Sequence, residues 1–384
     1  MSRLFPAAET GTPFDGALAR FFASVGASLV STPLLQRAEP YLDTAGEDLR
    51  RRIFLTRGEG GETLCLRPDF TIPVCLAHIE GDEALPRRYA YNGLVFRQRR
   101  GEAAEFRQAG IENLGDTDRA RADAATLAEA LTALAACGLA EAERLSITIG
   151  DQGLFEAVLK ALDLPAGWQR RLIRTFGQND LLARALETLA SDRSGEVENI
   201  APDALALARE GRLAELEALV QARMDEAGLP PNRSRSPAEI AARLAEKVRL
   251  SDTRLRGAAL ERLRAFLSLD CAVSQASERL RALAEEHGLD LTGALGFFDA
   301  RAEALAAAGV DLSTLRYRAA FGRTLDYYTG FVFEIGAPGQ IEPLAGGGRY
   351  DRLVSYLGAR EPIPAVGFAL YLDRLPKAQK EARP

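Results

Sequence analysis

Apolar residues recur at the spacing of one helix face in several parts of the chain. Segments 14–27 and 120–137 both show it, with apolar residues three or four positions apart. Gly26, near the end of the first segment, and Gly138, directly after the second, stand where glycine commonly ends a helix. The same spacing continues from about 151 to 312, where Ala, Leu, Arg and Glu dominate. We therefore expect a helical subdomain over 151–312.

Runs rich in β-branched and aromatic residues predict the strands of a second, β-rich part. Four of these runs are expected to pair as hairpins, around the glycine-rich turn 58–61 and the charged loop 98–104. Pro33 cannot donate a ladder hydrogen bond, so its run ends there or lies at a sheet edge. A helix is expected from about Thr71, and another after Gly367. The predicted strands are 29–34, 52–56, 62–67, 88–97, 105–114, 144–149, 331–335 and 363–367.

These patterns predict an α+β fold in which helices interrupt a β-rich core. The core would comprise residues 1–150 and 313–376, with the helical insertion at 151–312 and a frayed tail at 377–384. A chain of 384 residues is long enough to form two or three domains. The stretch 228–237 has the most linker-like composition of the chain.

One face of the strand pair 88–97 and 105–114 mixes polar groups with glycine. On the second strand the period of two brings Gln108, Gly110 and Glu112 to the same face, together with Phe106. Glycine beside these polar groups leaves room for a ligand, although a solvated face is the simpler interpretation. The matching face of the first strand consists of Tyr89, Tyr91, Gly93, Val95 and Arg97.

The stretch 322–357 combines polar side chains with small residues. Arg323 precedes the adjacent Tyr327 and Tyr328, and Gly346–Gly348 follow after a turn. Buried polar groups need hydrogen-bond partners, which a small zwitterionic ligand would supply, and the glycines would permit its close approach. The alternative is that the glycines form a plain turn and the tyrosines alternate between core and surface. A phosphate loop is not indicated, because no Lys-Ser/Thr pair follows the glycines.

Composition and charge exclude several functional classes. Apolar residues make up 47% and charged residues 27%, as in ordinary globular proteins. The net charge of −6 argues against a protein whose main partner is nucleic acid. The N-terminus lacks the apolar core of a signal peptide, and no run of about 18 apolar residues occurs, so no membrane segment is expected.

Cysteine and histidine are too sparse to predict a zinc site or histidine acid–base catalysis. The two histidines are His78 and His287, and no two cysteines form a C-x-x-C pair. Scattered cysteines of this kind are expected to be reduced core thiols of a cytoplasmic protein. The four cysteines are Cys65, Cys75, Cys137 and Cys271.

Six motifs, in order along nearly the whole chain, make it similar to the class II aminoacyl-tRNA synthetases, and among them to histidyl-tRNA synthetase. The resemblance implies an antiparallel sheet flanked by helices, and RTLDYYTG with GGGRYD is specific for the histidyl branch. The motifs are LVSTP at 29–33, LRPDFT at 66–71, FR at 96–97 with FRQAGIENLG at 106–115, RTLDYYTGFVFE at 323–334, LAGGGRYDRL at 344–353, and VGFALYLDRL at 366–375.

The resemblance also implies a pocket for free histidine. An anionic oxygen suits the ammonium group, and paired hydrogen bonds to an imidazole reject ligands that lack one. The implied histidine-binding residues are Asp69, Thr71 and Gln108 for the ammonium, Glu112 and Tyr328 for the imidazole with Tyr327 and Tyr350 beside them, and Arg323 and Arg97 for the carboxylate.

Three departures from the synthetase pattern affect the nucleotide half of the site and the tRNA-reading domain. Arg99 replaces the glutamate that the synthetase carries two residues after Arg97, in a loop shorter than usual. Tyr371 replaces a small glycine next to the adenine position, where a phenol ring would fill nucleotide space. A synthetase would also continue by about 100 residues into an anticodon-binding domain. We therefore interpret Arg99, Tyr371 and Arg374 as a vestigial nucleotide site.

A kept amino-acid pocket beside a damaged nucleotide site resembles the synthetase-like regulatory subunit of ATP phosphoribosyltransferase. That resemblance implies a short-form catalytic subunit as partner, L-histidine as feedback effector, and a homodimer within a hetero-oligomer. It implies no catalytic residue, no metal, no cofactor, no nucleic acid and no membrane. Two alternatives stay open at this point: an enzyme that activates histidine with ATP, and a sensor of another amino acid that binds an unrelated protein.

Overall fold

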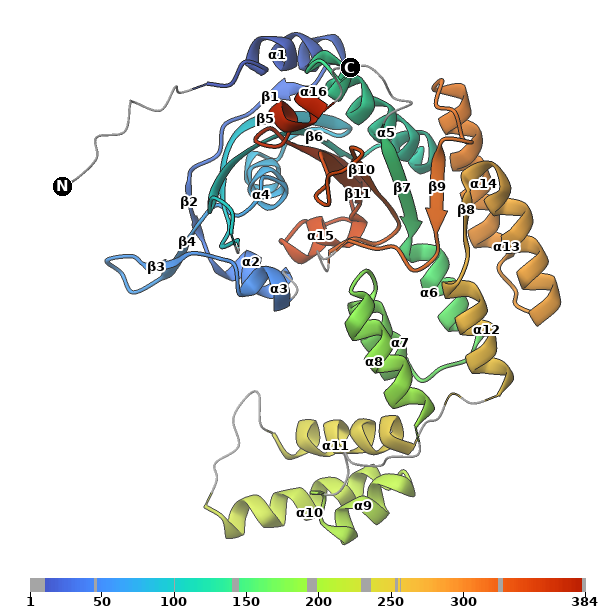
Figure 1. The fold of residues 1–384 in the computed structure, drawn as a ribbon. Helices are drawn as coiled ribbons and strands as arrows, with labels where there is room; N and C mark the ends of the chain where they lie inside the picture. Colours follow the sequence, from blue (N-terminus) through green and yellow to red (C-terminus); the bar gives the residue numbers. More distant parts are fainter. Residues whose placement is uncertain are drawn as a thin grey trace. The chain divides into compact units, whose positions relative to one another are not determined.

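The computed structural model describes residues 11–44, 47–99, 101–139, 145–191, 199–228, 236–252, 255, 257–323 and 327–381 (Figure 1). Contacts within the chain divide it into two compact units. Unit 1 comprises Met1–Ala157 and Phe266–Pro384, and unit 2 comprises Val158–Ala265. The second unit is therefore inserted into the first, and each is described by itself.

Unit 1 is built on a mixed sheet in which nine of the described strands take part. Its central strands are antiparallel, whereas β1 pairs with β5, and β7 with β9, in parallel. In spatial order the strands are β1 (Ser28–Leu29), β5 (Arg87–Phe96), β6 (Glu105–Leu114), β12 (Ala365–Tyr371), β11 (Ala345–Arg349), β10 (Phe331–Gly336), β7 (Ser146–Asp151), β9 (Leu315–Arg318) and β8 (Asp270–Ala272).

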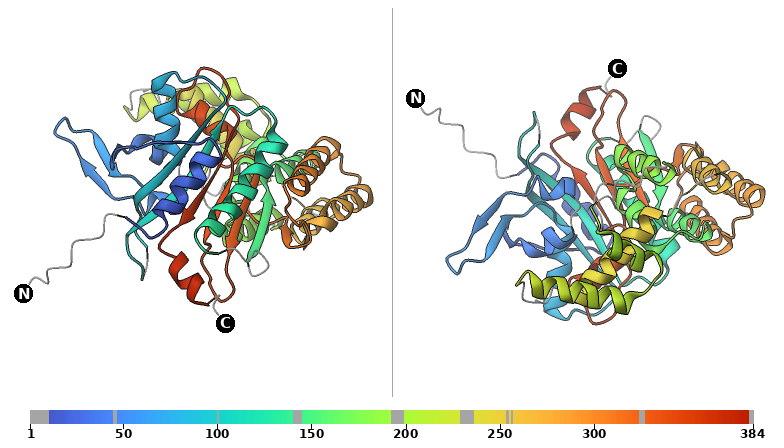
Figure 2. Two further views of the ribbon diagram at one scale, coloured as in Figure 1. Left: turned by 90° about the horizontal axis from the view of Figure 1, so that it is seen from above. Right: turned by 90° about the horizontal axis from the view of Figure 1, so that it is seen from below.

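Helices cover both faces of this sheet, and a smaller sheet lies beside it (Figures 1 and 2). The smaller sheet consists of β2 (Leu35–Arg37), β4 (Thr63–Leu66) and β3 (Leu55–Arg57). The helices are α1 (Asp15–Ser24), α2 (Glu39–Thr44), α3 (Glu47–Arg50), α4 (Thr71–Gly81), α5 (Arg119–Ala136), α6 (Gln152–Ala161), α13 (Val273–His287), α14 (Thr292–Ala307), α15 (Asp351–Tyr356) and α16 (Leu375–Glu381).

Two arginines and two aspartates form a buried ionic network between the sheet and its helices. Asp123 of α5 lies 2.7 Å from Nη2 of Arg349 and 3.5 Å from Nη1 of Arg301 on α14. Arg301 also contacts Asp151 at 2.5 Å. Each side chain of the network is at most 5% exposed. A charge buried to this degree is strongly destabilising without an oppositely charged partner, and each of the four has one. The network fixes α5 and α14 against the face of β11 from which Arg349 extends.

Unit 2 is helical, as predicted for this region. Its core consists of small and branched apolar residues, among them Leu216, Val220 and Val248. Trp168 of α7 donates a hydrogen bond of 2.8 Å from Nε1 to the carbonyl of Leu250 on α11. Its helices are α7 (Ala166–Thr175), α8 (Asn179–Ala190), α9 (Pro202–Arg209), α10 (Leu213–Glu226) and α11 (Pro237–Asp252), and both α6 and α12 (Ala258–Leu267) span a boundary to unit 1.

The inserted unit is shorter than the expected insertion 151–312. Residues 266–312 belong to unit 1, because β8 pairs with β9 in the large sheet and α14 is bound to α5 through Arg301 and Asp123. Helical spacing alone does not distinguish a helix of an inserted unit from a helix that covers the sheet.

Several predicted strands have different bounds in the structure, and the strand predicted at 52–56 begins only at Leu55. The predicted strand 29–34 is divided: β1 ends at Leu29, and the next paired residue is Leu35 of β2. Pro33, which has no amide hydrogen, lies in the interruption. The predicted strand 363–367 continues instead through Gly367 to Tyr371. The helix expected after Gly367 begins only at Leu375.

The predicted frayed tail at 377–384 is also wrong for its described part. Residues up to Glu381 belong to α16, and 382–384 lie outside the described residues. This helix is tied to the sheet side of the unit by Gln379, whose Nε2 donates a hydrogen bond of 2.6 Å to the carbonyl of Cys137. The polar composition of the segment did not reveal this anchor.

Candidate ligand-binding site

All nine residues predicted to bind histidine line one cavity of unit 1. The cavity has about 360 Å³ of empty space, including its open mouth. Of the three residues assigned to a vestigial nucleotide site, Tyr371 lines the cavity, and Arg99 and Arg374 are not among its lining residues. The nine are Asp69, Thr71, Arg97, Gln108, Glu112, Arg323, Tyr327, Tyr328 and Tyr350.

Glu112 is a buried lining residue of the cavity and lies near the end of β6. Thr71 donates a hydrogen bond of 2.8 Å to its Oε1, and the hydroxyl of Tyr350 donates one to its Oε2. Opposite it in the sheet is Gly367, where a Cβ would overlap the carboxyl group. Burial raises the pKa of Glu112 to about 8, although both hydrogen bonds act in the other direction. At neutral pH the empty site therefore holds a mostly protonated carboxyl group.

Asp69 presents one free oxygen to the cavity. Its Oδ1 accepts a hydrogen bond of 3.3 Å from the amide of Ile72 and so caps the first turn of α4. Its Oδ2 is buried and has no hydrogen-bond partner among the described residues. Burial raises the pKa of Asp69, while Arg97 lowers it. Such an unpaired oxygen is costly unless a cationic ligand group occupies the space beside it.

Arg323 brings a cation to the cavity. Its Nη1 donates hydrogen bonds of 2.9 Å to Glu334 and 3.2 Å to the carbonyl of Phe333, and its Nη2 donates one of 3.3 Å to the hydroxyl of Tyr371. The guanidinium reaches this position only because residue 346 is glycine, since a Cβ there would overlap it. Burial lowers the pKa of Arg323, but Tyr328 and Glu334 raise it above its usual value, so the group stays charged.

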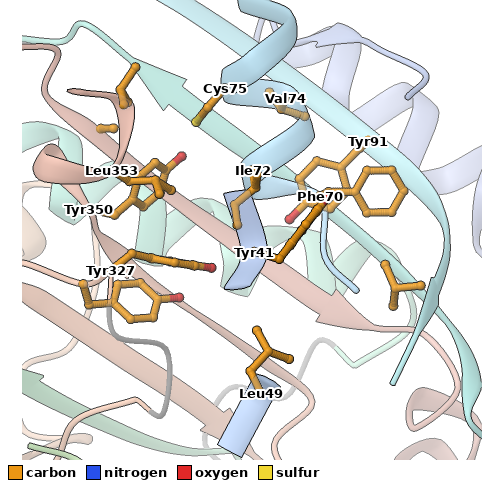
Figure 3. Close-up of a cluster of buried hydrophobic side chains, with 14 of the residues drawn as sticks. Tyr41, Leu49, Phe70, Ile72, Val74, Cys75, Tyr91, Tyr327, Tyr350 and Leu353 are labelled. Carbon is orange, nitrogen blue, oxygen red and sulfur yellow. The ribbon is translucent and has the colours of Figure 1, made fainter. Parts of the chain in front are cut away.

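Aromatic rings form the remaining walls (Figure 3). Tyr91 of β5 stacks on Phe70, with ring centroids 4.4 Å apart. Tyr327 lies between Tyr328 and Tyr350, with centroid distances of 5.0 and 5.9 Å. Burial raises the pKa of Tyr328 to about 12, so its hydroxyl keeps the proton that it can donate to a ligand. The walls thus combine apolar ring faces with hydroxyl groups.

Arg99 and Arg374 are engaged by carboxylates of the chain itself. Arg99 lies 2.6 Å from Glu102 and 3.4 Å from Asp373. Arg374 lies 3.3 Å from Glu342, and its guanidinium stands 4.3 Å from the ring centre of Tyr371. These pairs occupy the charges that would otherwise attract phosphate groups.

The sequence prediction missed five lining residues of the cavity. Tyr91 shares a strand face with Arg97, so the period of two could have indicated it. Gly346 belongs to the glycine run that was expected to admit a ligand, although it was not named as a site residue. Gly367, Phe368 and Ala369 depend on which strands become neighbours in the sheet, which the sequence does not reveal. Thr324–Asp326 of the RTLDYYTG motif lie outside the described residues. The missed residues are Tyr91, Gly346, Gly367, Phe368 and Ala369.

The described part of the chain shows neither a metal site nor a membrane-spanning helix. It contains no group of three or more His, Cys, Asp and Glu residues placed to hold a metal ion. None of its helices combines the length and the apolar character that crossing a bilayer requires. The four cysteines are buried and unpaired.

Comparisons with known proteins agree with the motifs. The family model described as "Histidyl-tRNA synthetase" matches residues 4–251 and 216–375. The ATP phosphoribosyltransferase regulatory subunit of Allorhizobium ampelinum is 54% identical over 95% of this chain and 97% of its own length. The protein of the same name from Sinorhizobium medicae is 53% identical, with the same coverage of both chains.

Solved structures share the fold. An ATP phosphoribosyltransferase regulatory subunit/histidyl-tRNA synthetase from Bacillus halodurans superposes with a TM-score of 0.62 at 25% identity, covering 99% of this chain and 82% of the other. Histidyl-tRNA synthetase from Nostoc sp. PCC 7120 gives the same TM-score at 17% identity, covering 100% of this chain and 76% of the other. The predicted class II synthetase-like α+β fold is thereby confirmed.

Proposed function

This chain belongs to the family of ATP phosphoribosyltransferase regulatory subunits, and we propose that it binds free L-histidine in the cavity around Glu112 and thereby regulates a short-form catalytic subunit. In this proposal the chain contributes no catalytic residue of its own. It acts in the cytoplasm, at the first step of histidine biosynthesis, as a homodimer within a hetero-oligomer.

One observation carries the proposal: three complementary groups surround a single cavity. The free Oδ2 of Asp69 suits an ammonium group, and Arg323 suits a carboxylate. Between them Glu112, with a pKa of about 8, can exchange a proton with an imidazole, whose own pKa lies near neutrality. Free histidine carries an ammonium, a carboxylate and an imidazole group. It would therefore give hydrogen-bond partners to Asp69, Arg323 and Glu112, whose burial without partners costs free energy.

Regulation follows from linkage. A ligand that binds one arrangement of this subunit better than another shifts the population toward that arrangement. If the catalytic partner also distinguishes the two arrangements, histidine and the partner change each other's affinity by the same factor. The proposal therefore requires that histidine binding and partner activity be coupled.

The internal pairing of Arg99 and Arg374 supports the non-catalytic part of the proposal over an enzyme that activates histidine with ATP. Both arginines already have carboxylate partners, and the ring of Tyr371 lies beside Arg374. A nucleotide would have to break these contacts and displace the ring.

Calorimetric titration with L-histidine tests the proposal. The wild-type chain should bind, and Asp69→Asn should weaken binding by at least about tenfold, because a charge-assisted hydrogen bond is lost. Asp203→Asn is the matched control, since Asp203 is exposed in unit 2 and pairs with Arg223. In an assay of a short-form ATP phosphoribosyltransferase, Asp69→Asn should weaken inhibition by histidine, and Asp203→Asn should leave this inhibition unchanged. Absence of heat at millimolar histidine would contradict the proposal.

A further inference from the structure

The hydroxyl of Tyr371 stands where cationic groups of the cavity converge. It accepts a hydrogen bond of 3.3 Å from Nη2 of Arg323, and Arg374 lies 4.3 Å from the centre of its ring. Although burial raises the pKa of Tyr371, Arg323, Arg97 and Arg374 together bring it below its usual value. Three arginines around one position favour an anion there, yet the hydroxyl group of Tyr371 occupies it.

The ring of Tyr371 is held in place from several sides. The residue is 7% exposed and pairs across β12 and β6 with Gln108. Its ring centre lies 6.3 Å from that of Phe106. The guanidinium group of Arg99 in turn covers the Phe106 ring, 3.8 Å from its centre. The ring is thus packed among neighbours and forms a fixed wall of the cavity.

Beyond this wall the structure is closed by ion pairs. Arg99 contacts Glu102 and Asp373, and Arg374 contacts Glu342. The loop that precedes β6 and the loop between β10 and β11 are thereby both joined to residues 373–374, which follow Tyr371 in the chain. A ligand that extended past the phenol ring would have to disrupt these pairs as well as the ring.

We propose that Tyr371 is a specificity-determining residue that restricts the cavity to amino acids whose carboxylate is free. This inference rests on the proposed function, because it assumes that Arg323 receives the carboxylate of the ligand. Nη2 of Arg323 is already bonded to the Tyr371 hydroxyl, so a carboxylate on Arg323 lies in contact with the phenol. A substituent on that carboxylate has to occupy the space of the ring.

The ring of Tyr371 thus distinguishes ligands by the size of the substituent on their carboxyl group. A free carboxylate beside Arg323 can accept hydrogen bonds from the guanidinium group and from the phenol. An N-substituted amide, an ester or an acyl phosphate of the same amino acid carries additional atoms on the carboxyl group, which collide with a packed aromatic ring. Esters and acyl phosphates are products of carboxyl activation, so the same residue that limits ligand length also prevents the subunit from responding to activated amino acids.

Two histidine derivatives of different size test this inference. Histidinamide and histidine benzylamide are both uncharged at the carboxyl position, so the ratio of their affinities reports size rather than charge. We expect the wild-type chain to bind the primary amide at least about tenfold more tightly than the benzylamide. Tyr371→Phe retains the ring and should keep this ratio, whereas Tyr371→Ala should bring it to within about threefold. Tyr371→Leu serves as a second variant in case the alanine variant does not fold.

The outcomes distinguish this inference from the proposed function. An unchanged ratio in folded Tyr371→Ala and Tyr371→Leu, or equal affinities in the wild-type chain, would overturn the role of Tyr371 and leave histidine binding intact. A wild-type chain that binds no L-histidine would reject the proposed function and, with it, this inference. Circular dichroism and thermal unfolding of each variant identify those that are folded.

Discussion

The hydroxyl of Tyr350 donates a hydrogen bond to Oε2 of Glu112 inside the cavity. Tyr350 directly follows β11 and Glu112 lies near the end of β6, and both are almost fully buried. The other carboxyl oxygen is bonded to Thr71 at the start of α4. A single protonatable group therefore connects three elements of the site, and its charge state affects both stability and binding.

The first prediction concerns the pH dependence of stability. The pKa of Glu112 is about 8 in the folded chain and near 4.5 when the group is solvated. Between these values the folded state holds a proton that the unfolded state has released, so the free energy of unfolding falls as pH rises from about 5 to 8. We expect wild type to lose about 2–4 kcal/mol relative to Glu112→Gln across this range. Denaturant unfolding at several pH values measures it, and parallel profiles would contradict it.

The second prediction concerns Gly346, which has no side chain where Arg323 crosses β11. A Cβ at this position would overlap the guanidinium group of Arg323, to which its three nearest atoms all belong. Gly346→Ala should therefore displace Arg323 and weaken histidine binding by at least about tenfold while the fold is retained. Calorimetry and thermal unfolding measure the two effects.

The matched control for this change is Gly296→Ala in α14, where an added Cβ meets no atom within 4 Å. Because alanine favours a helix interior over glycine by about 1 kcal/mol, this variant should be slightly more stable than wild type. Its histidine affinity should be unchanged. Equal affinities of the two alanine variants would show that Arg323 does not depend on the glycine.

The third prediction concerns the buried ionic network. Arg349→Met leaves Asp123 with one arginine fewer in a fully buried position, so we expect a loss of about 3–5 kcal/mol in the stability of unit 1. Arg281→Met is the control, because its partner Asp299 lies at the surface and its loss should not be measurable. Chemical denaturation monitored by circular dichroism compares them. A similar small effect of both substitutions would show that the network is dispensable.

The fourth prediction concerns nucleotide chemistry. Because Arg99 and Arg374 have internal partners and Tyr371 is packed beside them, the chain should not catalyse histidine-dependent exchange of pyrophosphate into ATP. A histidyl-tRNA synthetase assayed alongside provides the positive control. Exchange above background by the purified wild-type chain would restore the interpretation as a histidine-activating enzyme.

Local patterns predicted the site strands β5 and β6 well and the site strand β12 less well. The period of two placed Gln108 and Glu112 on one face, and both line the cavity. The continuation of β12 past Gly367 depends on its neighbours β6 and β11 rather than on the segment itself. Gly367 weakens a strand by its own propensity, yet here it provides the space that Glu112 occupies.

The buried ionic network lay beyond sequence reasoning for a physical reason. Asp123 and Arg301 are far apart along the chain and occur in helices that also carry many exposed charges. Only the packing of α5 and α14 distinguishes these two from the solvated charges around them. The positions of the cavity residues, in contrast, followed from motifs with a fixed order, because those motifs belong to strands that meet in the sheet.

Gly346 and Gly367, which line the cavity, limit how substitutions can change its volume. Every residue that can replace Gly346 or Gly367 adds atoms, so single substitutions there can only reduce the free volume. A lineage could thus become insensitive to its effector while every group that touches the ligand is still encoded. A survey of relatives that scores only charged and hydroxyl-bearing positions would count such a descendant as responsive, and would miss that the ligand no longer has room.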